Sequence, residues 1–262
     1  MLEQVDLDLS LSKADYKRRL PALQQRLYDL EHAMFQARAP VAVVFEGWGA
    51  AGKGSTINVL TERLDARGFR VVPITTPRTQ ETLYPWLRRF WLRIPAYGQM
   101  VIYDTSWYRR VLIERIHKTI NKLERELAYQ DIAEFEEQLV NDGSVLVKFW
   151  LHISKKEQAK RFKRLLKDKL TAWQVNDEDA AQHKAYKKYL TAVEEMLART
   201  DSPYAPWTIV EATDRYHTRI KVFETIIAAL EARLGMAALP PEPPPPSELA
   251  KRAAKEKEAA HA

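Results

Sequence analysis

The 262-residue sequence predicts an α/β fold in which helices flank a parallel sheet. Five short runs rich in Val, Ile and aromatic residues alternate with segments of helical periodicity, at residues 41–46, 70–74, 100–104, 145–153 and 207–212. Strands separated in this way by helices usually pair in parallel. The hydrophobic content of 46% is enough to bury one sizeable core, so we expect one compact domain with appendages rather than two domains.

The N-terminal segment, residues 1–38, is predicted to carry a long amphipathic helix over residues 13–37. Apolar side chains recur there at helical spacing: Leu20, Leu23, Leu27, Leu30 and Met34. The run VAVVFE at residues 41–46 is apolar almost without interruption, which predicts a strand covered by helices on both faces.

The segment after this strand, Gly47-Trp48-Gly49-Ala50-Ala51-Gly52-Lys53, has the spacing of a phosphate-binding loop of the Walker A type. Glycines let the backbone turn its N–H groups inward, the following helix adds the positive end of its dipole, and Lys53 adds a full charge. A helix is expected from Ser55 to Arg67, ended by Gly68. The predicted phosphate contacts are Gly47, Gly49, Ala50, Ala51, Gly52, Lys53, Gly54 and Ser55. The alternative is a glycine-rich turn that binds nothing.

Gly54 stands where this motif usually places the Ser or Thr whose hydroxyl binds Mg²⁺. That hydroxyl is displaced here to Ser55 or Thr56. Asp104, an acid at the end of the third predicted strand and beside the loop, is the expected Mg²⁺ ligand and, with Lys53, a catalytic residue. Asp104 alternatively caps the helix that follows, and the two roles are compatible. Arg109, Arg110 and Arg115 are expected on that helix, and Arg109 is the arginine proposed to reach the phosphates.

A basic segment at residues 155–169 offers a second group of phosphate contacts. It contains Lys155, Lys156, Lys160, Arg161, Lys163, Arg164, Lys167 and Lys169. Arg161 and Arg164, one turn apart, are predicted to bind a polyanion; the alternative is a solvated helix face. In WLRRFW at residues 86–91 the aromatic rings either stack on a base or, as we expect for Phe90 and Trp91, lie in the core.

Composition excludes some classes of function. The chain has no cysteine, which rules out disulfides, thiolate metal sites and a cysteine nucleophile. It has no long apolar run and no leader pattern, so we expect no membrane partner and a cytoplasmic location. The net charge of +6 suits a polyanionic ligand, and nothing indicates a specific nucleic acid. Residues 236–262, a proline-rich linker and a charged segment, are expected to be a solvated extension or a contact to a partner subunit or polyanion.

Several segments together resemble the polyphosphate kinase type-2 family: FEGWGAAGKG, RRFWLRIP, YDTSWYRRVLIERI, EFEEQLVNDGSVLVKFWLHISKKEQAKRFK, RTDSPYAPWTIVEA and RIKVFETI. The resemblance runs from about Leu7 to about Leu234. It implies a P-loop NTPase-like (thymidylate-kinase-like) core at residues 39–235 with a helical lid at about 155–190. It also implies Mg²⁺-dependent phosphoryl transfer between inorganic polyphosphate and a nucleotide such as AMP, ADP or GDP, in a cytoplasmic homo-oligomer, either dimer or tetramer.

The sequence departs from the family pattern at positions that the resemblance makes catalytic. Gly49 replaces an acid, Thr105 replaces an arginine, and the lid lacks expected basic residues at Thr171, Ala172, Trp173, Gln174, His183 and Ala185. Three hypotheses follow: an active polyphosphate-dependent nucleotide kinase, a weakened homologue that binds polyphosphate or nucleotide in a regulatory or structural role, or a P-loop kinase with another acceptor. If the second holds, Gly49→Asp with Thr105→Arg is expected to raise transfer.

Overall fold

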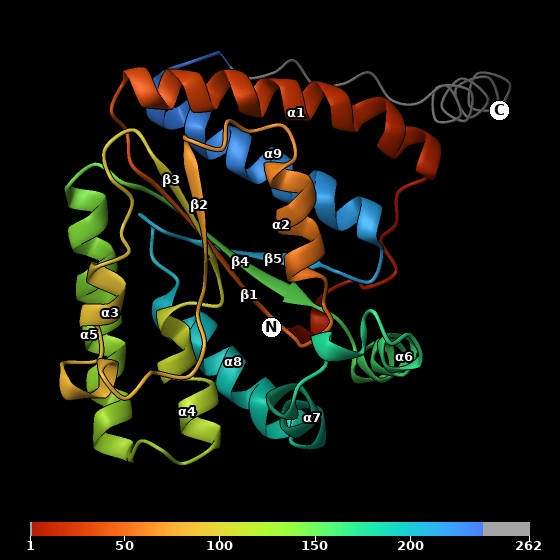
Figure 1. Ribbon diagram of the computed structural model, residues 1–262, viewed down its shortest axis with the longest axis vertical. Helices are drawn as coiled ribbons and strands as arrows, with labels where there is room; N and C mark the ends of the chain where they lie inside the picture. The colour runs from red at the N-terminus through yellow and green to blue at the C-terminus, as the bar shows by residue number, and fades with distance from the viewer. Residues whose placement is uncertain (1, 238–262) are drawn as a thin grey trace, which may run out of the picture.

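The computed structural model describes residues 2–237 and has a five-stranded, fully parallel sheet at its centre (Figure 1). The strand order is β2-β3-β1-β4-β5. The strands are β1 (Val41–Gly47), β2 (Phe69–Pro73), β3 (Met100–Asp104), β4 (Val145–His152) and β5 (Trp207–Glu211). Every residue of β1 and β4 is buried, as expected for strands covered on both faces. The α/β class predicted from the alternating pattern is confirmed.

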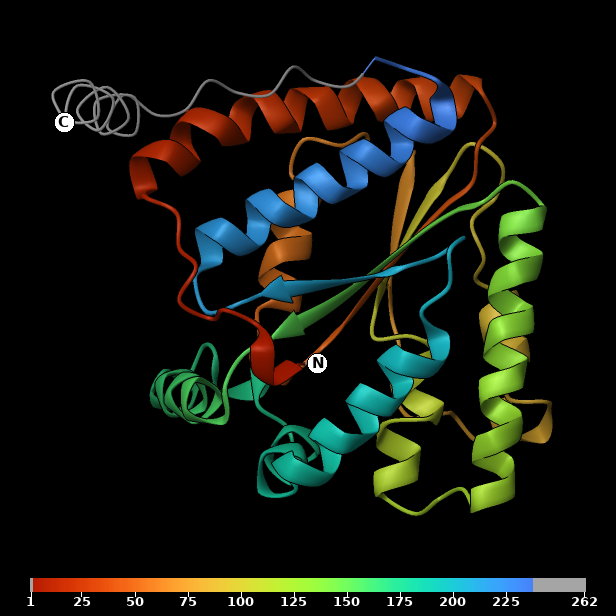
Figure 2. The same ribbon diagram turned by 180° about the vertical axis from the view of Figure 1, so that it is seen from behind.

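Helices cover both faces of the sheet (Figures 1 and 2). One face carries α1 (Lys13–Gln36), α2 (Lys53–Thr61) and α9 (Arg215–Leu234). The other carries α3 (Arg88–Trp91), α4 (Ile113–Ile116), α5 (Lys122–Asn141) and α8 (Tyr186–Thr200). The helices α6 (Lys155–Lys167) and α7 (Asp177–Lys184) lie beyond the carboxyl ends of the strands. Single 3₁₀ turns occur at Leu2–Gln4, Glu81–Leu83, Trp107–Arg110 and Ala172–Gln174.

Helix α1 matches its prediction closely. It buries Leu23, Leu27, Leu30 and Met34 against the core, with Leu20 partly buried beside them, and it packs along α9. The Ser12 hydroxyl caps its first turn by accepting from the Asp15 N–H at 3.0 Å.

The predicted end of α2 is wrong. Helix α2 ends at Thr61 rather than at Arg67, because the chain turns there to meet α1, where the Glu31 carboxylate accepts from the Asp65 N–H at 2.8 Å. Gly68 is not the helix end. A side chain at Gly68 would collide with Glu31, since its Cβ would lie 2.4 Å from Oε1, so this glycine allows the close approach to α1.

The helix expected after Asp104 is divided into the 3₁₀ turn Trp107–Arg110 and the short helix α4. Its cap is Ser106, whose hydroxyl accepts from the Tyr108 N–H at 3.3 Å, so the alternative of an Asp104 cap is wrong. Of the predicted extension at residues 236–262, all but the first two residues lie outside the described part of the chain. Within residues 2–237, no helix has the length and apolarity needed to cross a bilayer.

Candidate functional site

The loop from Gly47 to Lys53, here called the glycine-rich loop, joins β1 to α2 beyond the carboxyl end of the sheet. Gly47 has a φ of 151° and lies so close to β4 that a Cβ would be 2.6 Å from the Leu151 carbonyl oxygen. Gly52 has a φ of 103°, and Ala50 has a φ of 59°, which is unusual for a residue with a side chain. The sequence therefore places glycine at two positions that the loop's path requires.

Lys53 and the start of α2 supply positive charge to this loop. The Lys53 ammonium donates to the carbonyl oxygens of Gly47 and Trp48, each at 3.3 Å, so it lies inside the curve of the loop. The first N–H groups of a helix have no acceptor within the helix, and in α2 these belong to Lys53, Gly54 and Ser55. An anion held there would meet both the ammonium and these donors.

Trp48 anchors the loop to the core. Its indole is fully buried, stacks on Tyr186 of α8 with the ring centroids 4.1 Å apart, and donates to His152 Nδ1 at 3.0 Å. The indole N–H of Trp150 approaches the same nitrogen at 3.4 Å. Burial lowers the pKa of His152 to about 4, so this imidazole stays neutral and remains an acceptor at neutral pH.

Two carboxyl groups lie beside the loop at the ends of neighbouring strands. Asp104 ends β3, where its register partner on β1 is Phe45, and its side chain has no hydrogen-bond or ion-pair partner among residues 2–237. Glu46 is buried and accepts from the Ser106 N–H at 2.8 Å and its hydroxyl at 2.9 Å. Burial raises the pKa of Glu46 to about 7; the nearby Lys53 ammonium opposes this rise and the Asp104 charge adds to it.

Arg109 faces the same site but is already paired. Arg109 is only 6% exposed. Its guanidinium donates to Thr76 Oγ1 at 2.9 Å and forms a two-point ion pair with Glu178 of α7, one contact of which is 2.9 Å long. The hydrogen bond from Arg109 holds the pKa of the Glu178 carboxyl below its usual value.

Helix α7 also covers Gly49. The Gly49 N–H donates to Gln182 Oε1 at 2.7 Å, and a Cβ on Gly49 would lie 2.2 Å from Asp179 Oδ1 and 2.9 Å from its Cγ. Burial raises the pKa of Asp179. A side chain at position 49 therefore requires the Asp179 carboxyl group, or α7 itself, to move. The expected gain of transfer in Gly49→Asp with Thr105→Arg stays a prediction.

The two arginines predicted to bind a polyanion have different surroundings. Arg161 donates to four carbonyl oxygens, those of Ala50 and Ala51 in the loop and those of Ala212 and Thr213 after β5, at 2.7–3.1 Å. It also pairs with Glu157 at 2.9 Å. Arg164 is exposed and has no partner among the described residues. Arg161 therefore braces the loop, and Arg164 is the arginine of this pair that remains accessible to an anion.

One cavity of about 1520 Å³ contains all the residues predicted for the site. Lys53, Asp104, Arg109, Arg161, Arg164 and the loop residues from Gly47 to Ser55, apart from Trp48, line it. Sequence reasoning missed the acceptors Glu46, Glu178, Asp179 and Gln182. Glu46 was detectable as an acid at the end of a buried strand. The capping box that opens α7, Asn176 with Asp179, marked a helix start but not its contact with the loop.

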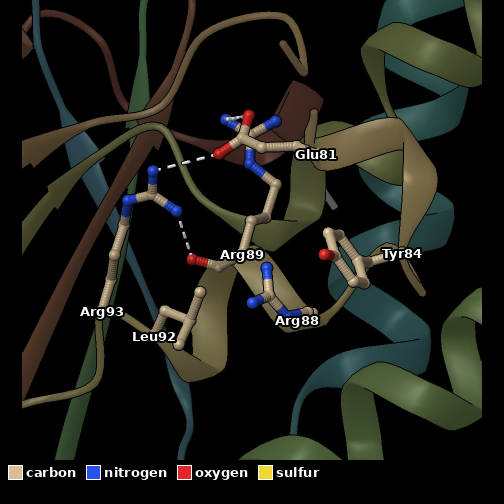
Figure 3. Close-up of a pocket in the computed structure, with 6 residues that line it drawn as sticks. All are labelled: Glu81, Tyr84, Arg88, Arg89, Leu92 and Arg93. Atoms are coloured by element: carbon tan, nitrogen blue, oxygen red, sulfur yellow. Dashed lines mark hydrogen bonds and ion pairs between the residues drawn. The ribbon is translucent and has the colours of Figure 1, made fainter. Parts of the chain in front are cut away.

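The segment around WLRRFW forms a separate, smaller cavity of about 260 Å³ (Figure 3). Arg88 lies over the Tyr84 ring, 4.0 Å from its centroid, while Arg93 and Arg89 both pair with Glu81. Phe90 is buried, as expected. Trp91 is 38% exposed, although its ring contacts Phe135 edge to face, so the expectation of core packing holds only in part for this residue.

The chain matches known proteins over most of its length. A sequence model described as Polyphosphate kinase 2 (PPK2) matches residues 10–236. The chain is 42% identical over 232 residues to the Polyphosphate:AMP phosphotransferase of Pseudomonas syringae pv. tomato. The matched region covers 88% of this chain and 46% of that protein. The chain is 36% identical over 218 residues to the ADP-polyphosphate phosphotransferase 2 of Rhizobium meliloti, covering 83% and 71% respectively.

Among solved structures, the Polyphosphate Kinase 2 of Arthrobacter aurescens superposes with a TM-score of 0.85 at 28% identity, covering 97% of this chain and 92% of that one. The chain spans about half the length of the polyphosphate:AMP phosphotransferases that it matches.

Proposed function

Because the chain belongs to the polyphosphate kinase 2 family, we propose that it transfers a phosphoryl group between inorganic polyphosphate and a nucleoside mono- or diphosphate. The observation that carries this proposal is the meeting, in one cavity, of the glycine-rich loop, the Lys53 ammonium and the free carboxylate of Asp104. Phosphoryl transfer needs mainly positioning and stabilisation of charge, and these groups supply both. The relatives named for AMP and ADP support a nucleotide as the second substrate.

In this proposal Lys53 and the first N–H groups of α2 hold the phosphate oxygens next to the transferred group. The preorganised donors act most strongly where charge develops in the transition state. Arg109 reaches the same phosphates once it leaves Glu178, and Arg164 receives the more distant part of the chain. Arg161 keeps the loop in shape through its four carbonyl contacts.

The proposed cofactor is Mg²⁺, held by Asp104. Its carboxylate has no protein partner among the described residues, lies beside the loop and is an oxygen ligand of the kind that Mg²⁺ prefers. Within residues 2–237 no three His, Asp or Glu residues are grouped to hold a metal by themselves. When bound, the ion neutralises negative charge on the phosphates.

A second candidate function, a polyphosphate-binding homologue with weakened turnover, is favoured by two observations. Thr105 supplies no positive charge at the site, and Arg109 is neutralised by Glu178. In this reading the loop still binds phosphate, and the chain has a regulatory or structural role. We also propose that the protein is cytoplasmic and a homo-oligomer, a dimer or tetramer, on the strength of the family resemblance alone.

The test is an assay of the purified chain with polyphosphate, Mg²⁺ and AMP, ADP or GDP, in which product nucleotide is measured. We expect turnover with at least one acceptor, and Lys53→Ala should lower it by a factor of about 10² or more while weakening tripolyphosphate binding. Lys187→Ala, an exposed lysine of α8 that does not line the cavity, is the matched control. Binding without turnover in the original chain would favour the second candidate. Unchanged tripolyphosphate affinity in Lys53→Ala would contradict both.

A further inference from the structure

Helix α7 places three acceptor side chains on the donors of the proposed phosphate site. Glu178 pairs with Arg109, and Gln182 accepts from the Gly49 N–H at 2.7 Å. Asp179 lies over Gly49 and near the Lys53 ammonium. Burial raises the pKa of the Asp179 carboxyl group; the charge of Glu178 adds to this rise and the Lys53 ammonium opposes it. Glu178 and Gln182 are one turn apart and therefore lie on the same face of the helix.

These contacts give the cavity an unusual balance of charge. Seven basic and seven acidic side chains of the described residues line it, and three of the acids, Asp177, Glu178 and Asp179, come from α7. A site for a polyanion needs a surplus of positive charge. Without the three acids of α7, the described residues that line the cavity comprise seven basic and four acidic side chains.

The contacts of α7 are also the kind that exchange readily. Glu178 is about one third exposed, so its carboxylate can move into solvent, whereas Arg109 is 7% exposed and then needs another anion as its partner. An anion that offers several charged oxygens to the same donors can therefore compete with them. Gln158 of α6, which donates to Gln182 Oε1 at 3.0 Å and to the Gly49 carbonyl at 3.3 Å, links α6 to the same arrangement.

We propose that α7 is a built-in competitor of the phosphate chain. Glu178, Asp179 and Gln182 determine the affinity and selectivity of the site because they occupy the groups that bind phosphate, and a ligand binds by displacing them together. A chain of linked phosphates can place charged oxygens at several of these donors at once, whereas all four oxygens of orthophosphate lie around one phosphorus atom. The inference rests on the proposed function for the identity of the anion, but the tests below require no turnover.

The first test measures the affinity of tripolyphosphate by calorimetry. Glu178→Gln keeps the shape of the side chain but removes its charge, and we expect binding about twofold to fivefold tighter, since up to about 1 kcal/mol of competition is lost. Asp177→Asn is the matched control, because Asp177 is an exposed acid of the same helix without a partner among the described residues. Binding that is unchanged or weaker in Glu178→Gln, or an equal gain in Asp177→Asn, would overturn the proposal.

The second test uses the contact between Gly49 and Asp179 and reads hydrogen exchange over residues 177–184. Gly49 does not have a positive φ, so Gly49→Ala is strained mainly by the contact with Asp179. We expect faster exchange in α7 for Gly49→Ala, and a smaller additional effect of this change in an Asp179→Ala background. Tripolyphosphate should likewise speed exchange in α7 of the original chain, and orthophosphate at equal concentration should do so less. Unchanged protection of α7 in Gly49→Ala, or with tripolyphosphate, would refute displacement.

The two proposals fail in different ways. Absence of product nucleotide with intact displacement of α7 would remove the transferase function alone. Turnover without any response of α7 would remove the competitor alone.

Discussion

At the residue scale, His152 couples the glycine-rich loop to pH. The buried imidazole accepts from Trp48 through Nδ1 and has a pKa of about 4, against an ordinary value of 6.5. Because the folded-state pKa lies below the unfolded one, the stability that His152 contributes is fully present above pH 6.5. It is lost as the pH falls towards 4, since the unfolded chain then binds the proton more strongly.

We therefore predict that the free energy of unfolding decreases between pH 6.5 and pH 4 by up to about 3 kcal/mol on account of this group. His152→Gln should make the pH dependence flatter in that window, whatever it does to stability at pH 7. Urea titrations of both proteins at half-unit pH intervals measure the difference. The comparison is needed because Glu46, whose pKa is raised to about 7, has the opposite effect over a similar range. Parallel curves would show that His152 is not the responsible group.

Thr105 is a second residue with a local consequence. It follows Asp104 with a φ of 65°, a conformation that β-branched residues adopt only under strain. Its N–H donates to the Phe45 carbonyl at 3.0 Å, which holds the backbone against β1. The strain is thus maintained by the junction between β1 and β3 beside the proposed metal ligand.

Because Asn tolerates this conformation better than Thr, we predict that Thr105→Asn raises the free energy of unfolding by about 1 kcal/mol. Thr105→Val, which keeps the branched shape, is the control and should give no gain. Thermal unfolding of the three proteins at pH 7 tests this. A destabilised Thr105→Asn would mean that the Thr side chain provides stabilisation that exceeds the backbone strain.

At the scale of elements, a buried charge joins β4 to the helices of one face. Lys148 of β4 is 0% exposed, and its ammonium donates to Glu136 of α5 at 2.7 Å, to the Tyr108 hydroxyl at 3.0 Å and to the Thr200 carbonyl of α8 at 2.8 Å. Glu136 in turn accepts from the Trp107 indole at 2.9 Å. A network satisfied at each atom fixes how β4, α5 and α8 meet.

Lys148→Met leaves the Glu136 carboxylate buried without its cation, so we predict a loss of about 3–5 kcal/mol in the free energy of unfolding. Lys148→Met combined with Glu136→Gln removes both charges and should be more stable than Lys148→Met alone. Denaturant titration of the single and double variants gives the coupling energy. If the double variant is the less stable of the two, the ion pair does not govern this junction.

At the scale of the whole molecule, the net charge of +6 is not spread evenly over the proposed site. Two of its accessible cations lie on α6, where Lys160 is 76% exposed and Arg164 has no partner among residues 2–237. Arg161, by contrast, is bound to carbonyl oxygens inside the fold. Long phosphate chains should therefore meet Lys160 and Arg164 but not Arg161.

We predict that polyphosphate affinity decreases steeply with salt and that Lys160→Gln with Arg164→Gln lowers the log–log slope by about one to two. Lys187→Gln with Lys188→Gln on α8, exposed lysines that do not line the cavity, should leave the slope unchanged. Affinities measured between low and moderate salt decide the matter. An equal change in both pairs of variants would mean that only total charge matters.

Much of the fold was determined by local sequence. The five apolar runs became the five strands because nearly continuous apolar residues need helices on both faces. The glycine-rich loop was predictable because glycine is required where φ is positive, as at Gly47 and Gly52, and where the backbone approaches a neighbouring strand, as at Gly47. The turn that needs these glycines is a local property of the chain. Lys53, Asp104 and Arg109 came together because the carboxyl ends of parallel strands share one edge.

Only the tertiary structure decided how these groups are used. The end of α2 depends on Glu31 of α1, and the use of Arg161 depends on carbonyl groups that follow β5. The close packing around Gly49 depends on Asp179 of α7. Each of these partners lies more than thirty residues away along the chain. Periodicity and spacing depend on residues close together in the sequence, so they predict local structure. They do not predict which side chain, distant in the sequence, accepts a hydrogen bond from a given donor.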